Sequence, residues 1–230
     1  MEKKVQIIAL LFLVAFFGAC GIDNYEPPES QLQGKLVYQG EPIHVQSNSV
    51  TFELWQSGFG KMTPIEVTVD QDGSYSAMLF DGDYKLIIPG GQGPFISSAN
   101  TDSLSVQLRG DMTFDIEVTP FYAIQNPEFS IADSTVTATC ALEKVITDEN
   151  AKSIASIELY ISKTQFVNRG TSISSQTING GDIADLNNIT LSAQIPELIP
   201  SQSYVFARIG IKMNNVEDML FSAVKKLQLN

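Results

Sequence analysis

Residues 65–88 read IEVTVDQDGSYSAMLFDGDYKLII, in which apolar residues recur at alternate positions around two Asp-Gly pairs. Alternation with a period of two predicts strands that bury one face, and Asp-Gly between such strands is a strong turn signal. Similar runs rich in Val, Ile, Phe, Tyr and Thr recur along the chain after residue 30, and none keeps helical spacing for long. The sequence therefore predicts an all-β fold.

The predicted strands form two groups, because Thr119-Pro120 closes the first one. The first group lies near residues 32–38, 50–55, 65–69, 74–80, 84–88, 104–108 and 112–118. Its inward-facing sets are Val50/Phe52/Leu54, Ile65/Val67/Val69, Tyr84/Leu86/Ile88 and Met112/Phe114/Ile116/Val118. The second group lies near residues 135–142, 154–162, 189–195, 204–213 and 219–229, with residues 121–129 and 168–186 expected to be irregular. We expect two β-sandwiches, residues 31–120 and 121–230, each of ordinary domain size.

The first 19 residues have the features of a secretory signal. Lys3 and Lys4 precede a mostly apolar run, Val5 to Phe17, which is shorter than the roughly 20 residues that span a bilayer. Gly18-Ala19-Cys20 places small residues before a cysteine, as bacterial lipoprotein processing requires, so we expect Cys20 to carry lipid. An ordinary signal peptide is the alternative. Residues 20–30 are polar, acidic and proline-bearing, which predicts a flexible tether.

The net charge and the cysteines limit which partners and which disulfides we expect for this protein. The chain has 14 Lys and Arg against 26 Asp and Glu, for a net charge of −12. An acidic surface argues against nucleic acid as a partner. Once Cys20 is lipidated, Cys140 has no partner for an intramolecular disulfide. It alternates with Val136 and Ala138, so we expect a small buried core residue.

Two parts of the chain resemble known sandwiches. The first resembles the prealbumin-like sandwich of carboxypeptidase regulatory domains, through Gly34-Lys35-Leu36-Val37-Tyr38, Asp70-Gln71-Asp72-Gly73-Ser74-Tyr75-Ser76 and Gly82-Asp83-Tyr84-Lys85-Leu86. The second, residues 198–204 followed by Val205, Ala207 and Ile209, resembles the E–F corner of fibronectin type III domains. This resemblance implies that Tyr204 is a structural corner tyrosine whose hydroxyl bonds back to the backbone.

With the lipidation signal and the tether, the two domains resemble a family of uncharacterised two-domain Bacteroidetes lipoproteins. Such proteins accompany starch-utilisation-type outer-membrane systems. The resemblance therefore implies lipid anchoring at the outer membrane, facing the cell surface. It also implies an outer-membrane transporter and a glycan-capturing lipoprotein as neighbours.

Three aromatic residues are candidates for binding glycans. Trp55 falls out of phase with the inward set Val50/Phe52/Leu54, and Phe59 stands between two glycines. Phe95 lies beside another glycine-rich loop. Exposed rings can stack on the apolar face of a sugar. The alternative is structural, namely that these rings close the open end of the sandwich.

Other candidate sites are weaker. Asp70 and Asp72 begin a sequence like a calcium loop, but its twelfth position is Asp81 instead of Glu, so we favour a turn. His44 is expected in an exposed loop, and one histidine is too few for a His-based metal site. Ser103 and Ser134 follow aspartates in a pattern that resembles a bacterial O-glycosylation acceptor.

We find no catalytic constellation and no cofactor motif in the sequence. The prediction is a non-catalytic cell-surface lipoprotein that binds polysaccharide or oligosaccharide, or serves as an accessory component of an uptake system. The alternative is a structural or protein-interaction scaffold that faces the periplasm.

Overall fold

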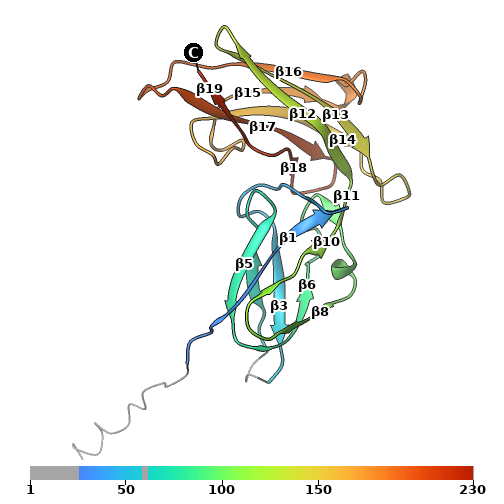
Figure 1. The fold of residues 1–230 in the computed structure, drawn as a ribbon. Helices are drawn as coiled ribbons and strands as arrows, with labels where there is room; N and C mark the ends of the chain where they lie inside the picture. Colours follow the sequence, from blue (N-terminus) through green and yellow to red (C-terminus); the bar gives the residue numbers. More distant parts are fainter. Residues whose placement is uncertain (1–25, 59–61, 230) are drawn as a thin grey trace, which may run out of the picture.

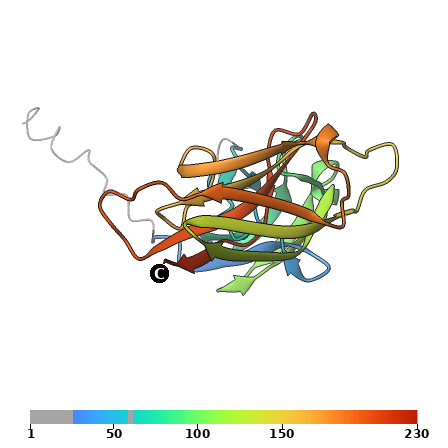
Figure 2. The same ribbon diagram turned by 90° about the horizontal axis from the view of Figure 1, so that it is seen from above.

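The computed structural model of the chain describes residues 26–58 and 62–229. It contains two β-sandwiches, one above the other in Figure 1, and the named strands β1–β11 and β12–β19 pair only within their own domain. The all-β prediction is confirmed. Figure 2 shows the C-terminal sandwich from above, with the N-terminal domain beneath it. The described part of the chain contains no helix that is long and apolar enough to cross a membrane.

The N-terminal domain packs two sheets face to face. The first is built on β1 (Ser30–Tyr38), which pairs with β2 (Glu41–Pro42), β5 (Ser74–Leu79), β9 (Met112–Thr113) and β10 (Ile116–Glu117). The second has the order β4 (Ile65–Thr68), β3 (Thr51–Gln56), β6 (Gly82–Ile87), β8 (Leu104–Leu108). A short pair joins β7 (Phe95–Ile96) to β11 (Thr119–Pro120), and a 3-10 turn spans Ser98–Asn100.

The predicted inward residues of this domain mostly reach its core. Val50, Phe52 and Leu54 are at most 1% exposed, as their alternation requires. Ile65 is the exception, with 40% of its surface exposed. It begins the edge strand β4, which among the described strands pairs with β3 alone. The inward prediction for Ile65 is therefore wrong, although Val67 on the same strand is buried.

The C-terminal domain is a second sandwich. One sheet has the order β12 (Tyr122–Ala132), β13 (Thr135–Lys144), β16 (Ile189–Gln194). The other has the order β15 (Ser172–Asn179), β14 (Ile154–Ser162), β17 (Tyr204–Met213), β18 (Leu220–Phe221), with β19 (Lys225–Gln228) also paired to β17. A second 3-10 turn spans Gly180–Asp182. Cys140 is buried as predicted, and burial raises the pKa of its thiol to about 11.

Two segments predicted to be irregular contain strands, namely β12, which begins within residues 121–129, and β15, which lies within residues 168–186. β12 accommodates Pro127 because the register with β13 shifts between Gln125 and Glu128, where Asn126 adopts a φ of 49°. β15 is a polar edge strand, so it lacks the apolar alternation by which a strand is recognised. Both errors come from strands at sheet edges, where little of the strand is buried.

Candidate functional site

The two domains meet where the segment after β2 lies against β18. The backbone N–H of Phe221 donates to the carbonyl oxygen of His44 at 3.0 Å, a single strand-like bridge between the domains. The amide of Gly93 donates to Asp218 Oδ2 at 2.8 Å, which adds a second hydrogen bond across the junction. The junction is therefore a specific contact and not a loose linker.

Arg208 of β17 lies at the centre of this contact. Its side chain is fully buried, and Nη1 donates to the Val45 carbonyl oxygen of the N-terminal domain at 3.1 Å. Nε donates to the Val167 carbonyl oxygen, and the guanidinium carbon lies 3.6 Å from the centre of the Phe221 ring. Burial lowers the pKa of Arg208 to about 9, so the group stays cationic at neutral pH.

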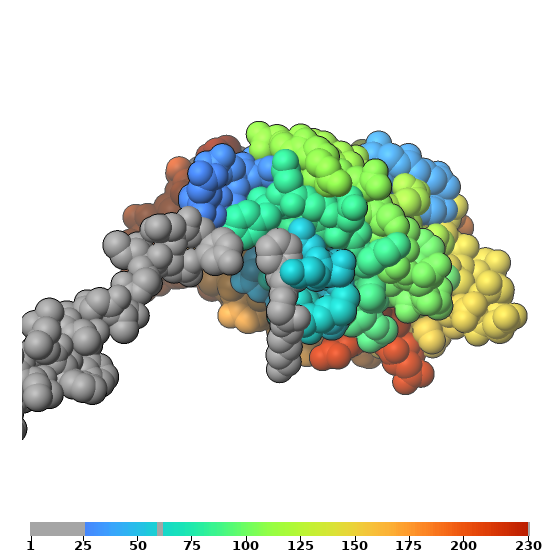
Figure 3. All heavy atoms as spheres, turned by 90° about the horizontal axis from the view of Figure 1, so that it is seen from below, coloured from blue at the N-terminus to red at the C-terminus, as the bar shows by residue number. Residues whose placement is uncertain are grey.

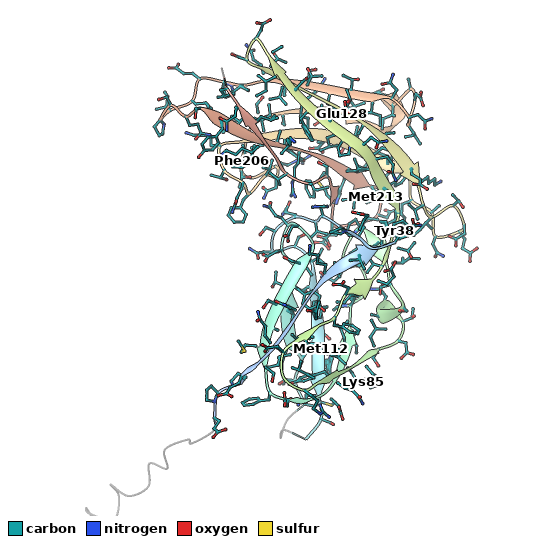
Figure 4. The ribbon with its side chains drawn as sticks, in the orientation of Figure 1. Tyr38, Lys85, Met112, Glu128, Phe206 and Met213 are labelled. Atoms are coloured by element: carbon teal, nitrogen blue, oxygen red, sulfur yellow. The ribbon has the colours of Figure 1, made fainter. Side chains whose placement is uncertain are left out.

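A groove of about 510 Å³ opens between the domains beside this contact. Its walls come from β2 and the end of β1 on one side and from β12, β13 and β18 on the other. Figure 4 places Tyr38 at the domain junction, where its partly buried ring belongs to the groove lining. The apolar lining includes Ile43, Ile124, Leu220 and Phe221, and the polar lining includes Gln39, Glu41, His44, Gln125 and Glu143.

Local geometry holds these polar groups in place. Tyr38 pairs with Glu41 across a tight turn in which Gln39 and Gly40 both have positive φ. Gln39 Nε2 donates to the Tyr38 hydroxyl at 2.9 Å. On the opposite wall, Gln125 Nε2 donates to Glu143 Oε2 at 3.0 Å. Amides and hydroxyls both donate and accept, so the groove suits a ligand rich in hydroxyl groups.

His44 is partly buried in the groove wall, and the prediction of an exposed loop histidine is wrong. Burial lowers the pKa of its imidazole, and the positive charge of Arg208 lowers it further. At neutral pH the ring is therefore uncharged, with one nitrogen that donates and one that accepts.

A more polar cleft of about 450 Å³ lies at the same junction. Its lining includes Glu158, which accepts hydrogen bonds from Ser156 Oγ at 2.9 Å, from Arg169 Nη2 at 3.0 Å and from the Tyr160 hydroxyl. Burial alone would raise the pKa of Glu158, but these hydrogen bonds outweigh burial and hold it below its usual range. The Glu158 carboxylate is thus already saturated by its own domain.

The structure describes two of the three predicted glycan-binding aromatics, and it does not bring Trp55 and Phe95 together in one site. Trp55 is partly exposed on the outer face of β3, and its indole Nε1 donates to Glu53 Oε2 at 2.8 Å. It pairs with Lys85, which Figure 4 places near the end of the domain away from the junction. Phe59 lies outside the described residues. Figure 3 views this end of the N-terminal domain from below, where the start of the described chain lies in dark blue.

Phe95 does not belong to a surface site. It is 4% exposed and packs in the core, and its ring covers Gly93 so closely that a Cβ there would meet it at 2.3 Å. The prediction of a ring available to sugars is therefore wrong for Phe95. The structural alternative applies, because the glycine-rich loop folds the ring inward to close the sandwich.

The Asp70–Gly73 sequence forms a turn. Gly73 has a φ of 82° and its amide donates to the Asp70 carbonyl oxygen at 2.9 Å. The Asp72 carboxylate accepts from the amide and the hydroxyl of Ser74, at 3.1 and 2.6 Å. Within residues 26–58 and 62–229, no cluster of three or more His, Cys, Asp and Glu side chains could hold a metal ion. Asp72 therefore has a structural role in the turn.

Tyr204 is not a corner tyrosine. Its ring lies 5.6 Å from that of Phe206 with Lys226 Nζ 4.0 Å from its centre, and its hydroxyl makes no hydrogen bond to the described residues. The corner prediction is wrong because a corner tyrosine is defined by a hydroxyl that bonds back to the backbone, whereas the Tyr204 ring, at the first position of β17, packs against Phe206 and Lys226 instead. The first domain contains the related contact, in which the Tyr84 hydroxyl donates to the Phe80 carbonyl oxygen at 2.7 Å.

Two further predictions concern the ends and the surface of the chain. Cys20 and the signal segment lie outside the described residues. Ser134 is exposed in the turn between β12 and β13, whereas Ser103 is partly buried beside Asp102. Both serines remain candidates for glycosylation on sequence grounds.

Comparison with known proteins gives the family. The family model described as "Protein of unknown function (DUF3823) N-terminal domain" matches residues 30–119, and "Domain of unknown function (DUF3823_C)" matches residues 122–226. No curated protein matches the chain.

Solved structures agree with the family models. A DUF3823 family protein from Parabacteroides merdae is 32% identical, with 88% of this chain and all of that chain covered and a TM-score of 0.78. One from Bacteroides ovatus is 29% identical, with 87% and 100% covered and a TM-score of 0.78. A Bacteroides uniformis protein described as a candidate carbohydrate binding protein is 18% identical, with 88% and 100% covered and a TM-score of 0.70. Since the family models match most of its length, the chain belongs to the DUF3823 family, a two-domain family of unknown function.

Proposed function

We propose that this chain is a non-catalytic carbohydrate-binding protein that holds a neutral oligosaccharide in the groove between its domains. One observation carries the proposal: the partly buried Tyr38 ring lies in a groove whose polar rim comes from both domains. The groove volume of about 510 Å³ falls within the roughly 300–1,000 Å³ of small-molecule sites.

The chemistry of the groove matches that of a sugar. A pyranose offers an apolar C–H face, which stacks on an aromatic ring, and a rim of hydroxyl groups, which need donors and acceptors. Tyr38 supplies the ring, and Gln39, Gln125 and Glu143 supply the hydrogen bonds. Glu41 and Glu143, on a chain of net charge −12, disfavour uronic acids and sulfated sugars. A neutral glycan is therefore the best fit.

The description of the B. uniformis relative supports a carbohydrate ligand for this fold. Our proposal also includes the features expected from the sequence, namely a lipid on Cys20 and a place at the cell surface beside an outer-membrane transporter and a glycan-capturing lipoprotein. The segment before β1 leaves from the end of the N-terminal domain that lies away from the junction, as Figure 1 shows. With a lipid on Cys20, the N-terminal domain would then lie between the membrane and the groove.

Binding is tested with residues 21–230 and a panel of maltohexaose, cellohexaose, xylohexaose and mannohexaose, by isothermal titration calorimetry. We expect saturable binding of at least one member. Tyr38→Ala should weaken it by roughly thirtyfold, as for a central aromatic contact, and Trp55→Ala should leave it unchanged. If Trp55→Ala abolishes binding and Tyr38→Ala does not, the site lies on the outer face of β3. If no member binds, the proposed function is wrong.

Location is tested in intact cells that express the full-length chain. Added protease should degrade the protein at the cell surface, and Cys20→Ala should remove its acyl chains and release it from the membrane. Complete protection from protease until the cells are lysed would instead favour a scaffold that faces the periplasm.

A further inference from the structure

Arg208 lies directly behind both walls of the groove. The residue that receives its Nη1 hydrogen bond, Val45, follows the wall residue His44, and the ring on which its guanidinium stacks belongs to the wall residue Phe221. His44 and Phe221 are themselves joined by a backbone hydrogen bond of 3.0 Å. One buried side chain therefore contacts the residue next to the N-terminal wall and the Phe221 ring of the C-terminal wall, where the two walls meet.

The energetics of Arg208 are unusual for a residue that only stabilises a core. Its side chain is fully buried, yet no carboxylate of the described residues forms an ion pair with it. Its Nη2 has no hydrogen-bond partner within that part of the chain. Removing a charge from water is costly unless a counter-charge compensates, and replacement of buried charges by apolar residues is often neutral or stabilising. A contribution to the free energy of folding therefore does not explain why this buried position is an arginine.

The shape of the guanidinium group explains the arginine at position 208 better. The guanidinium is planar and rigid, so it can stack on an aromatic ring and donate to carbonyl oxygens in fixed directions at the same time. Arg208 uses both abilities. It stacks on Phe221, donates to Val45 in one domain, and donates to Val167 in the other. Lysine or methionine of similar length cannot reproduce that set of contacts.

We infer that Arg208 is a positioning residue that fixes the two domains relative to each other and thereby sets the spacing of the groove walls. As a statement about ligand binding, this inference rests on the proposed function. As a statement about domain geometry, it stands independently and can be tested without a ligand.

The geometric test measures the distance between spin labels on the two domains by pulsed electron paramagnetic resonance. Exposed Gln107 in β8 and Thr190 in β16 are replaced by labelled cysteines in residues 21–230, where Cys140 is buried and stays unlabelled. Wild type should give one narrow distance distribution. Arg208→Met should broaden it, and Arg208→Lys, which keeps the charge without the planar fork, should broaden it less.

Arg109→Met is the matched control. Arg109 forms a salt bridge with Asp83 at 2.9 Å, with side chains 59% and 68% exposed, and it takes no part in the junction. Its removal should leave the distance distribution as in wild type. Circular dichroism shows whether each variant keeps its β-structure, and Arg208→Lys serves if Arg208→Met does not fold.

The binding test uses whichever oligosaccharide of the panel binds wild type. Arg208→Met should weaken binding by about tenfold, as expected when a site is loosened without loss of a contact group. An unchanged distance distribution in both Arg208 variants would overturn the inference, whatever binds. A broadened distribution with unchanged affinity would overturn the statement about ligand binding, because the groove would not depend on Arg208, and would support the statement about domain geometry. Absence of binding by wild type would defeat the proposed function, while the distances would still decide the role of Arg208.

Discussion

Glu158→Gln tests how much the charged, hydrogen-bonded carboxylate of Glu158 in β14 contributes to the stability of the fold. The Glu158 side chain is 3% exposed, and its carboxylate accepts hydrogen bonds from Ser156, Tyr160 and Arg169. Glutamine keeps the shape and removes the charge. Hydrogen bonds to charged groups are worth about 1.5–3 kcal/mol, against about 1 for neutral ones. Arg169 is 76% exposed, so its ion pair adds little.

With the hydrogen bonds from the buried Tyr160 and the partly buried Ser156 weakened, we expect the free energy of unfolding to fall by about 1–3 kcal/mol at pH 7. The pKa of Glu158 is lowered in the folded protein, so the ionised group stabilises the fold above its ordinary pKa of 4.5. That contribution is lost as the pH falls through the lowered pKa of the folded state. The difference between wild type and Glu158→Gln should therefore shrink on acidification.

The assay is urea denaturation of both proteins over a series of pH values from 7 downward. Ser156→Ala is a useful companion, because it removes one donor and leaves the charge. A difference between wild type and Glu158→Gln that is equal at every pH would refute the reasoning, as would equal stability at pH 7.

Three further predictions concern stability and reactivity. Gly34→Ala should destabilise the fold by about 1–3 kcal/mol, because a Cβ there would lie 2.0 Å from the Phe114 carbonyl oxygen. Gly90→Ala is the control and should leave stability unchanged, because a Cβ at Gly90 meets nothing within 4 Å. Equal denaturation midpoints for the two variants would contradict this prediction. Burial raises the pKa of the Cys140 thiol to about 11, so the thiol should stay unreactive toward a disulfide reagent at pH 8 until urea unfolds the chain. Rapid reaction of the native protein would show that the thiol is exposed. Tyr204→Phe should leave the denaturation midpoint unchanged, and a loss of about 1 kcal/mol would reinstate the corner role.

Local pattern was enough to predict the strands that face a single core. Val50, Phe52 and Leu54 alternate with polar residues and all three are buried, because a strand with one buried face leaves a period of two in the sequence. The same pattern placed Trp55 on the outer face. Neither inference needed any knowledge of distant residues.

The groove could not be predicted in this way. Its residues come from segments as far apart as Tyr38, Gln125 and Phe221, and only the docking of the two domains brings them together. One signal was available in the sequence. Arg208 interrupts the otherwise uncharged run Val205 to Ile211. The structure gives the reason, because the neighbouring strand β14 is buried at every position from Ile157 to Ser162, as in a sheet covered on both faces.

The most direct test of the account is a crystal structure of residues 21–230 with the oligosaccharide that binds it best. We predict a sugar ring stacked on Tyr38, with hydroxyl groups that contact Gln39 or Glu41 of the N-terminal domain and Gln125 or Glu143 of the C-terminal domain. A sugar bound only beside Trp55 on the outer face of β3, with an empty groove, would contradict the account.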